Sequence, residues 1–304
     1  MSLHLKYRPK TFDEVIGNEE VIEILSNMLE KNDCPHSFLF TGPTGTGKTT
    51  VARIMADELG CVGEDLKEID IADFRGIDMA REIRRKSGYK PISGPCRVWV
   101  LDEAHELTTQ AQDALLKILE DTPRHVYFIL CTTDDHKLKP TLKGRCSTFA
   151  MKTLEDRQMM SLLRRVVDGE DETLLKPVYQ QIIQDGLGHP RNALQILEQV
   201  LSVEPDSRLK TAEKAAVEYS QSIELCRALM NENTTWQGVS KILTGLKQEE
   251  PEKIRRHVLG YCQSVLLKTT NNRAGLVMEN FLEPFYNTLM PGLVFACYNI
   301  ICGE

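Results

Sequence analysis

Long apolar runs, paired cysteines and a surplus of basic residues are all missing from this sequence of 304 residues. No segment approaches the roughly 20 apolar residues that span a bilayer. The polar residues 1–10 also lack the apolar core of a signal peptide. We therefore predict a protein that is neither bound to a membrane nor secreted. Its expected compartment is the cytoplasm, or that of a host cell if the chain is viral.

The cysteines are scattered, since no two of the nine form a C-x-x-C pair. This usage is typical of reduced, buried thiols and predicts neither a zinc site nor a disulfide framework. A net charge of −7 argues against a protein coated in nucleic acid, but it permits a local basic strip. With 41% hydrophobic and 27% charged residues, the chain is long enough for two or three modest globular domains.

One glycine-rich stretch organises the sequence. Residues 42–49, GPTGTGKT, match the pattern G-x-x-x-x-G-K-[ST], with an apolar run before them and a predicted helix over 51–59. The glycines let consecutive backbone N–H groups face the oxygens of a phosphate group. The alternative interpretation is a glycine-rich turn that matches the pattern by chance. Lys48 would reach the β and γ phosphates of a nucleoside triphosphate, and Thr49 would hold Mg²⁺. The predicted phosphate-loop contacts are Gly42, Pro43, Thr44, Gly45, Thr46, Gly47, Lys48, Thr49 and Thr50.

Two further apolar runs predict buried strands that end in polar side chains. The run over 97–101 is followed by Asp102 and Glu103. Asp102 would complete the Mg²⁺ shell and Glu103 would orient the attacking water, unless the pair only caps a turn. The run over 125–131 ends in Thr132 and Thr133, whose hydroxyls would bond a γ-phosphate or the water, or cap the next turn.

A basic segment lies between the phosphate loop and the acidic strand end. Residues 74–90 hold six positive and two negative side chains. Taken alone, they favour a solvated helical face with an internal pair between Glu82 and Lys86. The alternative is a strip that neutralises a nucleic-acid backbone. The basic residues are Arg75, Arg81, Arg84, Arg85, Lys86 and Lys90.

Several other side chains have two interpretations each. The N-terminus is expected to be extended, because Arg8 precedes a proline. Arg145 lies in a polar turn, where it would either be solvated or act on the nucleotide of a neighbouring subunit. Arg191 lies in the first turn of a helix, where the simple interpretation is a surface salt bridge. Residues 6–9 would form a solvated arm. Alternatively, Tyr7 and Arg8 would line the base end of a nucleotide together with the apolar turn of Val15, Ile16 and Gly17.

The pattern changes near residue 150. Strand-like runs precede this point, and amphipathic helical windows follow it at 156–167, 174–185 and 191–201. A break at 203–207 separates a last helical block. We predict an α/β domain at 1–150, a helical domain at 151–205 and an all-helical domain at 206–304. The apolar stripes of the last block predict packing against other subunits.

Four stretches together resemble the clamp-loader subunits of the AAA+ ATPase family, both the replication factor C small subunits and the bacterial γ subunit. They are KYRPKTFDEVIGNEEV, FRGIDMAREI, KGRC and GHPRNALQILE, within residues 6–201. The resemblance implies an α/β P-loop AAA+ domain with a parallel sheet flanked by helices, a small helical lid and a C-terminal all-α collar domain.

The resemblance also implies roles for single residues. Arg145 would be an arginine finger acting on a neighbour, Arg191 the sensor-2 arginine of the lid, and Thr133 the sensor-1 residue, where replication factor C subunits often carry Asn. Tyr7 and Arg8 would contact adenine, and Gln112 would couple neighbouring subunits. The resemblance further implies that the basic segment is a helix that lies along primer–template DNA. Its expected DNA contacts are Arg75, Arg81, Arg84, Arg85 and Lys86.

The sequence departs from the family in three places. The γ subunit's four-cysteine zinc module is absent, because residues 60–64 hold one cysteine, so no zinc is predicted. Glycine replaces serine in KGRC, and the last hundred residues match no family pattern. This divergent tail and the compact size are compatible with a phage or other viral origin.

We therefore expect an ATPase, stimulated by DNA and clamp, that uses ATP and Mg²⁺ to open a sliding clamp and place it on primer–template DNA during replication. It would be one subunit of a hetero-oligomeric, pentameric loader. The alternatives are another DNA-acting AAA+ remodeller, for recombination or origin loading, and a structural subunit that binds ATP without hydrolysis. Glu103 and Arg145 argue against the structural subunit. A helicase is disfavoured because two RecA-like domains of roughly 150 residues each would use up the chain.

Overall fold

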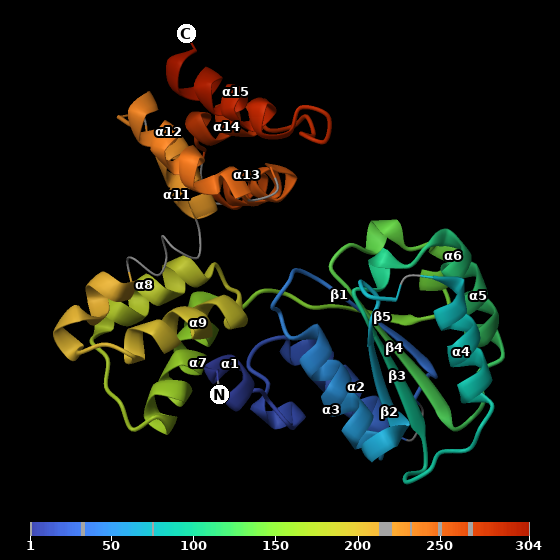
Figure 1. Cartoon of the computed structure of the whole chain (residues 1–304). Helices are drawn as coiled ribbons and strands as arrows, with labels where there is room; N and C mark the ends of the chain where they lie inside the picture. The colour runs from blue at the N-terminus through green and yellow to red at the C-terminus, as the bar shows by residue number, and fades with distance from the viewer. Residues whose placement is uncertain are drawn as a thin grey trace. The chain divides into compact units, whose positions relative to one another are not determined.

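The chain forms two compact units, Met1–Arg208 and Leu209–Glu304, in the computed structural model (Figure 1). The structure describes residues 2–31, 34–74, 76–212, 221–231, 233–248, 251–266 and 270–303. Among these residues no helix is both long and apolar enough to cross a bilayer. The finer division of the first unit at residue 150 stays a prediction.

A five-stranded sheet forms the centre of the first unit, with the strand order β2-β3-β4-β1-β5 (Figure 1). All four pairings between these strands are parallel, so the strands end at a common edge. In register, Thr41 lies opposite Thr132, and Asp70 lies opposite Asp102. The strands are β1 (Ser37–Thr41), β2 (Leu66–Asp70), β3 (Arg97–Asp102), β4 (Val126–Thr132) and β5 (Ser147–Ala150).

Helices cover both faces of this sheet (Figure 1). Because side chains alternate along a strand, Val98 and Val100 of β3 join the core shared with α3, whereas Trp99 and Leu101 join the core shared with α4 and α5. This arrangement confirms the predicted parallel sheet flanked by helices. The helices are α1 (Leu3–Lys6), α2 (Glu19–Glu30), α3 (Lys48–Glu58), α4 (Ile77–Ser87), α5 (Thr109–Glu120) and α6 (Pro140–Lys143). Short 3₁₀ turns are η1 (Phe12–Glu14), η2 (Gly63–Asp65), η3 (Ala104–Glu106) and η4 (Asp135–Lys137).

Two local expectations were wrong. The N-terminus was expected to be extended before Pro9, but Leu3–Lys6 form a helical turn whose Leu3 is buried. Ser2 Oγ also donates a hydrogen bond to Glu198 Oε2 at 2.7 Å, so a contact with a distant helix holds this turn. The strand β5 was missed, because its four residues include only one large apolar side chain, Phe149.

The first unit also contains a helical bundle, α7 (Asp156–Gly169), α8 (Lys176–Gly186) and α9 (Pro190–Leu201), followed by the turn η5 (Pro205–Ser207). These bounds lie within two residues of the predicted windows, because each helix carries an apolar stripe. A capping box of Glu155 and Gln158 begins α7, and a proline begins α9. We call this bundle the lid. It joins the sheet where Met151 N–H donates to Thr41 O at 2.7 Å.

The described secondary structure of the second unit consists of helices and short loops without a strand, which agrees with the predicted all-helical domain. Its core gathers Leu225, Val258, Phe281, Leu293 and Cys297. Inside it, the buried carboxylate of Glu252 accepts a hydrogen bond from Phe285 N–H at 3.0 Å. The elements are α11 (Gln221–Met230), α12 (Trp236–Gly245), η6 (Leu246–Gln248), α13 (Pro251–Leu266), α14 (Asn272–Asn280) and α15 (Leu289–Cys302).

A buried ion pair holds the basic helix α4 against the sheet. Arg97 at the start of β3 lies 3.0 Å from Asp65, and their side chains are 7% and 0% exposed. The same guanidinium donates to the carbonyl of Lys86 at 2.6 Å, near the end of α4. Asp65 accepts the N–H groups of Ile92 and Ser93, each at 2.7 Å. One pair therefore fixes the end of α4 and the loop that follows it.

We expect Asp65→Ala to lower the free energy of unfolding of the first unit by about 3–5 kcal/mol, because Arg97 would stay buried without its partner. Burial alone would raise the pKa of Asp65, but hydrogen bonds from Ser93 and Arg97 bring it below its usual value. The stabilisation is therefore complete above the pKa of an unfolded aspartate, and it is lost as the pH falls through the lower folded-state pKa. Urea denaturation at neutral and acid pH measures both effects.

Glu64→Ala is the matched control, because Glu64 is the neighbouring acid, is 81% exposed and pairs with Lys67. Its removal should leave the urea midpoint unchanged at neutral pH. An Asp65→Ala protein that is as stable as Glu64→Ala would contradict this account of the ion pair.

Candidate nucleotide-binding site

The glycine-rich loop connects β1 to α3. Gly42, Gly45 and Gly47 have φ values of +138°, +77° and +97°, which disfavour any side chain. Gly42 is also sterically confined, since a Cβ there would lie 2.2 Å from the carbonyl oxygen of Met151. The loop therefore depends on glycine both for its backbone conformation and for its contact with the segment that leads to the lid.

Lys48 lies inside this loop and is only 6% exposed. Its Nζ donates to the carbonyl oxygens of Gly42 at 2.8 Å and Pro43 at 2.9 Å. Burial lowers the pKa of Lys48, while nearby carboxylates, Glu103 foremost, oppose this shift. A cation is thus held against the glycine-rich loop, where the phosphates of a nucleotide would lie.

The end of β3 meets the start of α3 at the common edge of the sheet. Thr49 Oγ1 donates to Asp102 Oδ2 at 2.7 Å, and Asp102 Oδ1 accepts Glu103 N–H at 2.9 Å. A hydroxyl and a carboxylate in contact fit the oxygen ligands that Mg²⁺ prefers. The two residues predicted to hold the metal are therefore brought together, and they could do so with water and phosphate oxygens as further ligands.

The two threonines that end the β4 segment have different surroundings. Thr133 Oγ1 donates to Glu103 Oε2 at 3.2 Å. Thr132 is fully buried, and its hydroxyl accepts Asp134 N–H at 3.1 Å, which caps the next turn. His105 Nδ1 also lies 3.3 Å from Glu103 Oε2. The carboxylate predicted to orient water is therefore held by the predicted sensor threonine, and it gains a histidine neighbour that the sequence did not single out.

A cavity opens beside the loop, with walls from three parts of the first unit. Arg8 Nε donates to Thr50 Oγ1 at 3.1 Å, and burial, followed by the charge of Arg53, lowers the pKa of Arg8. The Tyr7 ring packs against Gly169 at the end of α7. The lining includes Tyr7, Arg8, Val15, Ile16, Gly45, Thr46, Gly47, Thr50, Leu154, Leu162, Arg165, Arg191 and Leu194. The predicted base-end residues thus lie with the loop.

The lid reaches the phosphate loop at the start of α9. The Cβ of Arg191 lies 3.4 Å from the position that a Cβ on Gly45 would take. His189, two residues earlier, has its Nδ1 at 2.8 Å from Thr44 O. The sequence did not predict this histidine, nor Leu154, Leu162, Arg165 and Leu194, because the apolar period of a lid helix indicates a core face without telling which residues border a ligand.

The other predicted residues lie apart from this cavity's described lining. Arg145 pairs with Glu120 and donates to Thr141 O at 3.2 Å. Gln112 is buried, and its amide contacts Leu107 O and Lys137 O at 3.2 Å each and Lys139 N–H at 2.8 Å, all within the chain.

The basic helix α4 presents exposed guanidinium groups at Arg81, Arg84 and Arg85. The expected pair between Glu82 and Lys86 is confirmed at 2.6 Å. Arg75, the first of the predicted DNA contacts, lies outside the described residues. Whether this helix binds DNA stays a prediction.

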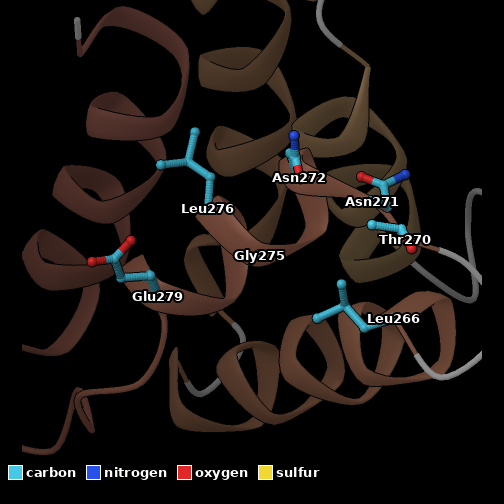
Figure 2. Close-up of a pocket in the computed structure, with 7 residues that line it drawn as sticks. All are labelled: Leu266, Thr270, Asn271, Asn272, Gly275, Leu276 and Glu279. Carbon is cyan, nitrogen blue, oxygen red and sulfur yellow. The ribbon is translucent and has the colours of Figure 1, made fainter.

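A second hollow lies on the C-terminal unit, beside α14 and the end of α13 (Figure 2). Its described lining carries one ionisable side chain, the carboxylate of Glu279, and no cation. Its described lining therefore offers a phosphate group no positively charged side chain. The lining residues are Leu266, Thr270, Asn271, Asn272, Gly275, Leu276 and Glu279.

The sequence is similar to that of known replication proteins. A family model described as DNA polymerase III, delta subunit, matches residues 17–73 and 64–155. The gamma/tau subunit of Mycobacterium tuberculosis is 36% identical over 232 aligned residues, and the match covers 69% of this chain and 40% of that protein. DNA polymerase III subunit tau of Bacillus subtilis is 31% identical over 296 aligned residues, and the match covers 88% of this chain and 52% of that protein. The chain thus spans about half of these relatives or less.

Solved structures show a similar fold. The RuvB Holliday junction branch migration motor of Thermotoga maritima superimposes with a TM-score of 0.62 at 20% identity, covering 78% of this chain and 85% of that one. At this identity the likeness concerns the fold alone. The relatives named above are bacterial and lend no support to a viral origin.

We expect Gly42→Ala to weaken ATP binding tenfold or more, because the new Cβ collides with Met151 O and turns the loop's N–H groups away from the phosphates. Each hydrogen bond to a charged group that is removed costs about 1.5–3 kcal/mol. Gly63→Ala is the control: φ is also positive there, at +56°, but the Cβ would meet nothing within 4 Å. Calorimetric titration with Mg-ATP measures the difference. Equal affinities in the two variants would contradict the steric argument.

Proposed function

We propose that this chain, an AAA+ protein related to the gamma and tau subunits of bacterial DNA polymerase III, is an ATPase subunit of a loader that places sliding clamps on primer–template DNA. The observation that supports the ATPase most strongly is the contact of Thr49 with Asp102 beside the buried Lys48. It joins a phosphate loop to a pair of carboxylates, which are the two parts that hydrolysis of a nucleoside triphosphate needs.

In this proposal each residue of the site has one task. Lys48 and the loop's N–H groups bind the phosphates, while Thr49 and Asp102 hold Mg²⁺, which neutralises phosphate charge when bound. Glu103 orients the attacking water and accepts its proton. Its hydrogen bond from Thr133 supports this task, because a carboxylate acts as a base only when it is aimed at the water. Arg191 touches the γ-phosphate from the lid.

A neighbouring subunit completes the site. Arg145 is partly exposed and held by Glu120, so its guanidinium is available at the surface of the first unit. We propose that it serves the nucleotide of the next subunit as an arginine finger. The second unit supports assembly, since α15 exposes Phe295 by 64% and Tyr298 by 46%. Large apolar side chains exposed on one helix are typical of an interaction surface.

The partners in this proposal are the clamp, the primer–template DNA and the other subunits of a pentameric assembly in the cytoplasm. The exposed guanidinium groups of α4 support a DNA contact, because they lie on one helix while the chain as a whole is acidic. Arg97 and Asp65 hold the end of that helix, so its side chains project from a rigid support. We propose no zinc site.

The experiment that tests the proposal is ATP turnover by the loader assembled with this chain, measured alone, with primed DNA, and with primed DNA plus the cognate clamp. We expect low basal turnover, and the highest rate with DNA and clamp together. Glu103→Gln should lower the stimulated rate by about 10²–10⁴-fold while ATP still binds. The control Glu20→Gln, an exposed acid on α2, should behave like the wild type.

The basic helix provides a second arm of the same experiment. Arg84→Ala with Arg85→Ala should remove most of the DNA stimulation and flatten the salt dependence of DNA binding, by roughly 0.9 in slope for each phosphate that the protein no longer neutralises. Arg157→Ala with Arg164→Ala removes the same charge from exposed positions on the lid and serves as the control. Stimulation by DNA that ignores the clamp would favour another DNA-acting AAA+ remodeller over a loader.

A further inference from the structure

We propose that His189 is a positioning residue of the phosphate loop: by holding the Thr44 carbonyl, it aims the N–H of Gly45 at the phosphates of the nucleotide. The lid would then prepare the loop for binding, in addition to covering it. This inference rests on the proposed function, since it requires that the cavity binds a nucleotide.

The first step is the hydrogen bond itself. His189 immediately precedes α9, and its Nδ1 lies 2.8 Å from Thr44 O. A carbonyl oxygen only accepts, so Nδ1 carries the proton and donates. Burial lowers the pKa of His189; the hydrogen bond to the Thr44 carbonyl opposes this shift, and the nearby Lys48 adds to it. Nδ1–H is the donor both in this neutral tautomer and in the protonated imidazole, so the geometry of the hydrogen bond alone assigns the donor.

The second step is the geometry of the peptide bond between Thr44 and Gly45. The C=O and N–H of a trans peptide point in opposite directions. A donor that holds the Thr44 carbonyl toward the lid therefore turns the Gly45 N–H away from the lid histidine and into the loop. The φ of +77° at Gly45 keeps this orientation accessible to the backbone.

The third step concerns the neighbouring carbonyls. The carbonyls of Gly42, Pro43 and Thr44 are consecutive, and each accepts a hydrogen bond from a side chain. Lys48 serves Gly42 and Pro43, and Thr46 Oγ1 also donates to Pro43 O, at 2.9 Å. For Thr44 the side-chain donor comes from outside the motif, from His189 of the lid. The motif thus orients its own first two peptides and relies on the lid for the third.

The fourth step is that His189 has a fixed position. The preceding Gly188 has a φ of +76°, and a Cβ there would lie 2.7 Å from Leu154 O. Gly188 O accepts Leu154 N–H at 2.8 Å, so the connection into α9 is tied to the segment that enters the lid. The Cβ atoms of His189 and Arg191 lie 3.9 and 3.4 Å from the position of a Cβ on Gly45. The same helical turn therefore carries the residue that orients the loop and the predicted sensor arginine.

The test compares three variants of the full chain by calorimetric titration with Mg-ADP and Mg-ATP. His189→Ala should raise the Kd for both nucleotides about tenfold, because one oriented hydrogen bond to phosphate is removed. His189→Asn, whose Nδ2 takes nearly the place of Nδ1, should restore affinity to within about threefold of the wild type. In turnover measurements His189→Ala should raise KM with little change in kcat, since the contact serves bound nucleotide throughout.

His125→Ala is the matched control, because its Nε2 also lies 3.0 Å from a backbone carbonyl, that of Tyr89, away from the cavity's described lining. The inference is overturned if His189→Ala binds ADP as tightly as His125→Ala. It is also overturned if His189→Asn binds nucleotide as weakly as His189→Ala, since the loss of the hydrogen-bond donor would then not explain the loss of affinity. If neither the wild type nor His125→Ala binds ADP, the proposed function itself fails, and the inference with it.

Discussion

The hydrogen bond between Thr49 Oγ1 and Asp102 Oδ2 is the contact on which the rest of the site depends. It joins the start of α3 to the end of β3, although β4 lies between β1 and β3 in the sheet. The contact forms because parallel strands end at one edge, where loops from different strands converge. The same geometry places Lys48, which is buried in the loop, and Glu103, which comes directly after Asp102, at this edge of the sheet. The glycine-rich loop and the carboxylate that is predicted to orient water thereby meet without belonging to one segment of the chain.

Much of this half of the site could be predicted from the sequence, because its elements carry strong local signals. Glycines with positive φ, a lysine before a helix, and an apolar run that ends in two acids each have a local physical cause. The topology of a parallel sheet then brings Asp102 to Thr49. The contact of Glu103 with Thr133 follows from the same rule, but only the structure separates Thr133 from Thr132, which caps a turn. The roles assigned to these residues in catalysis stay predictions.

Of the lid residues that reach the loop, Arg191 was expected from the family resemblance, but the contact of His189 could not be predicted, because it joins segments that are distant in sequence and leaves no periodic trace. His189 touches Thr44 across 145 positions, and the apolar stripe of α9 indicates only which face is buried. The helical turn α1 and the strand β5 were not predicted for the same reason, because each depends on a contact with a distant part of the chain. Ser2, next to α1, bonds Glu198, and β5 pairs with β1. Arg8 illustrates the consequence for energetics. Burial, followed by the charge of Arg53, lowers its pKa, and the charge of Arg191 from the lid adds to this shift, so an anion in the cavity would offset the repulsion among these arginines.

The central claim is that this chain holds half of a catalytic site, which a neighbour's Arg145 completes. The most direct measurement is ATP turnover by the assembled loader carrying Arg145→Ala, beside the Kd of the isolated variant for Mg-ATP. The account predicts turnover lowered by about 10³-fold or more with an unchanged Kd, because an arginine finger acts on the transition state of the adjacent nucleotide. Lys143→Ala, which removes a nearby cation paired with Asp135, should retain full turnover. Normal hydrolysis by assembled Arg145→Ala would contradict the claim.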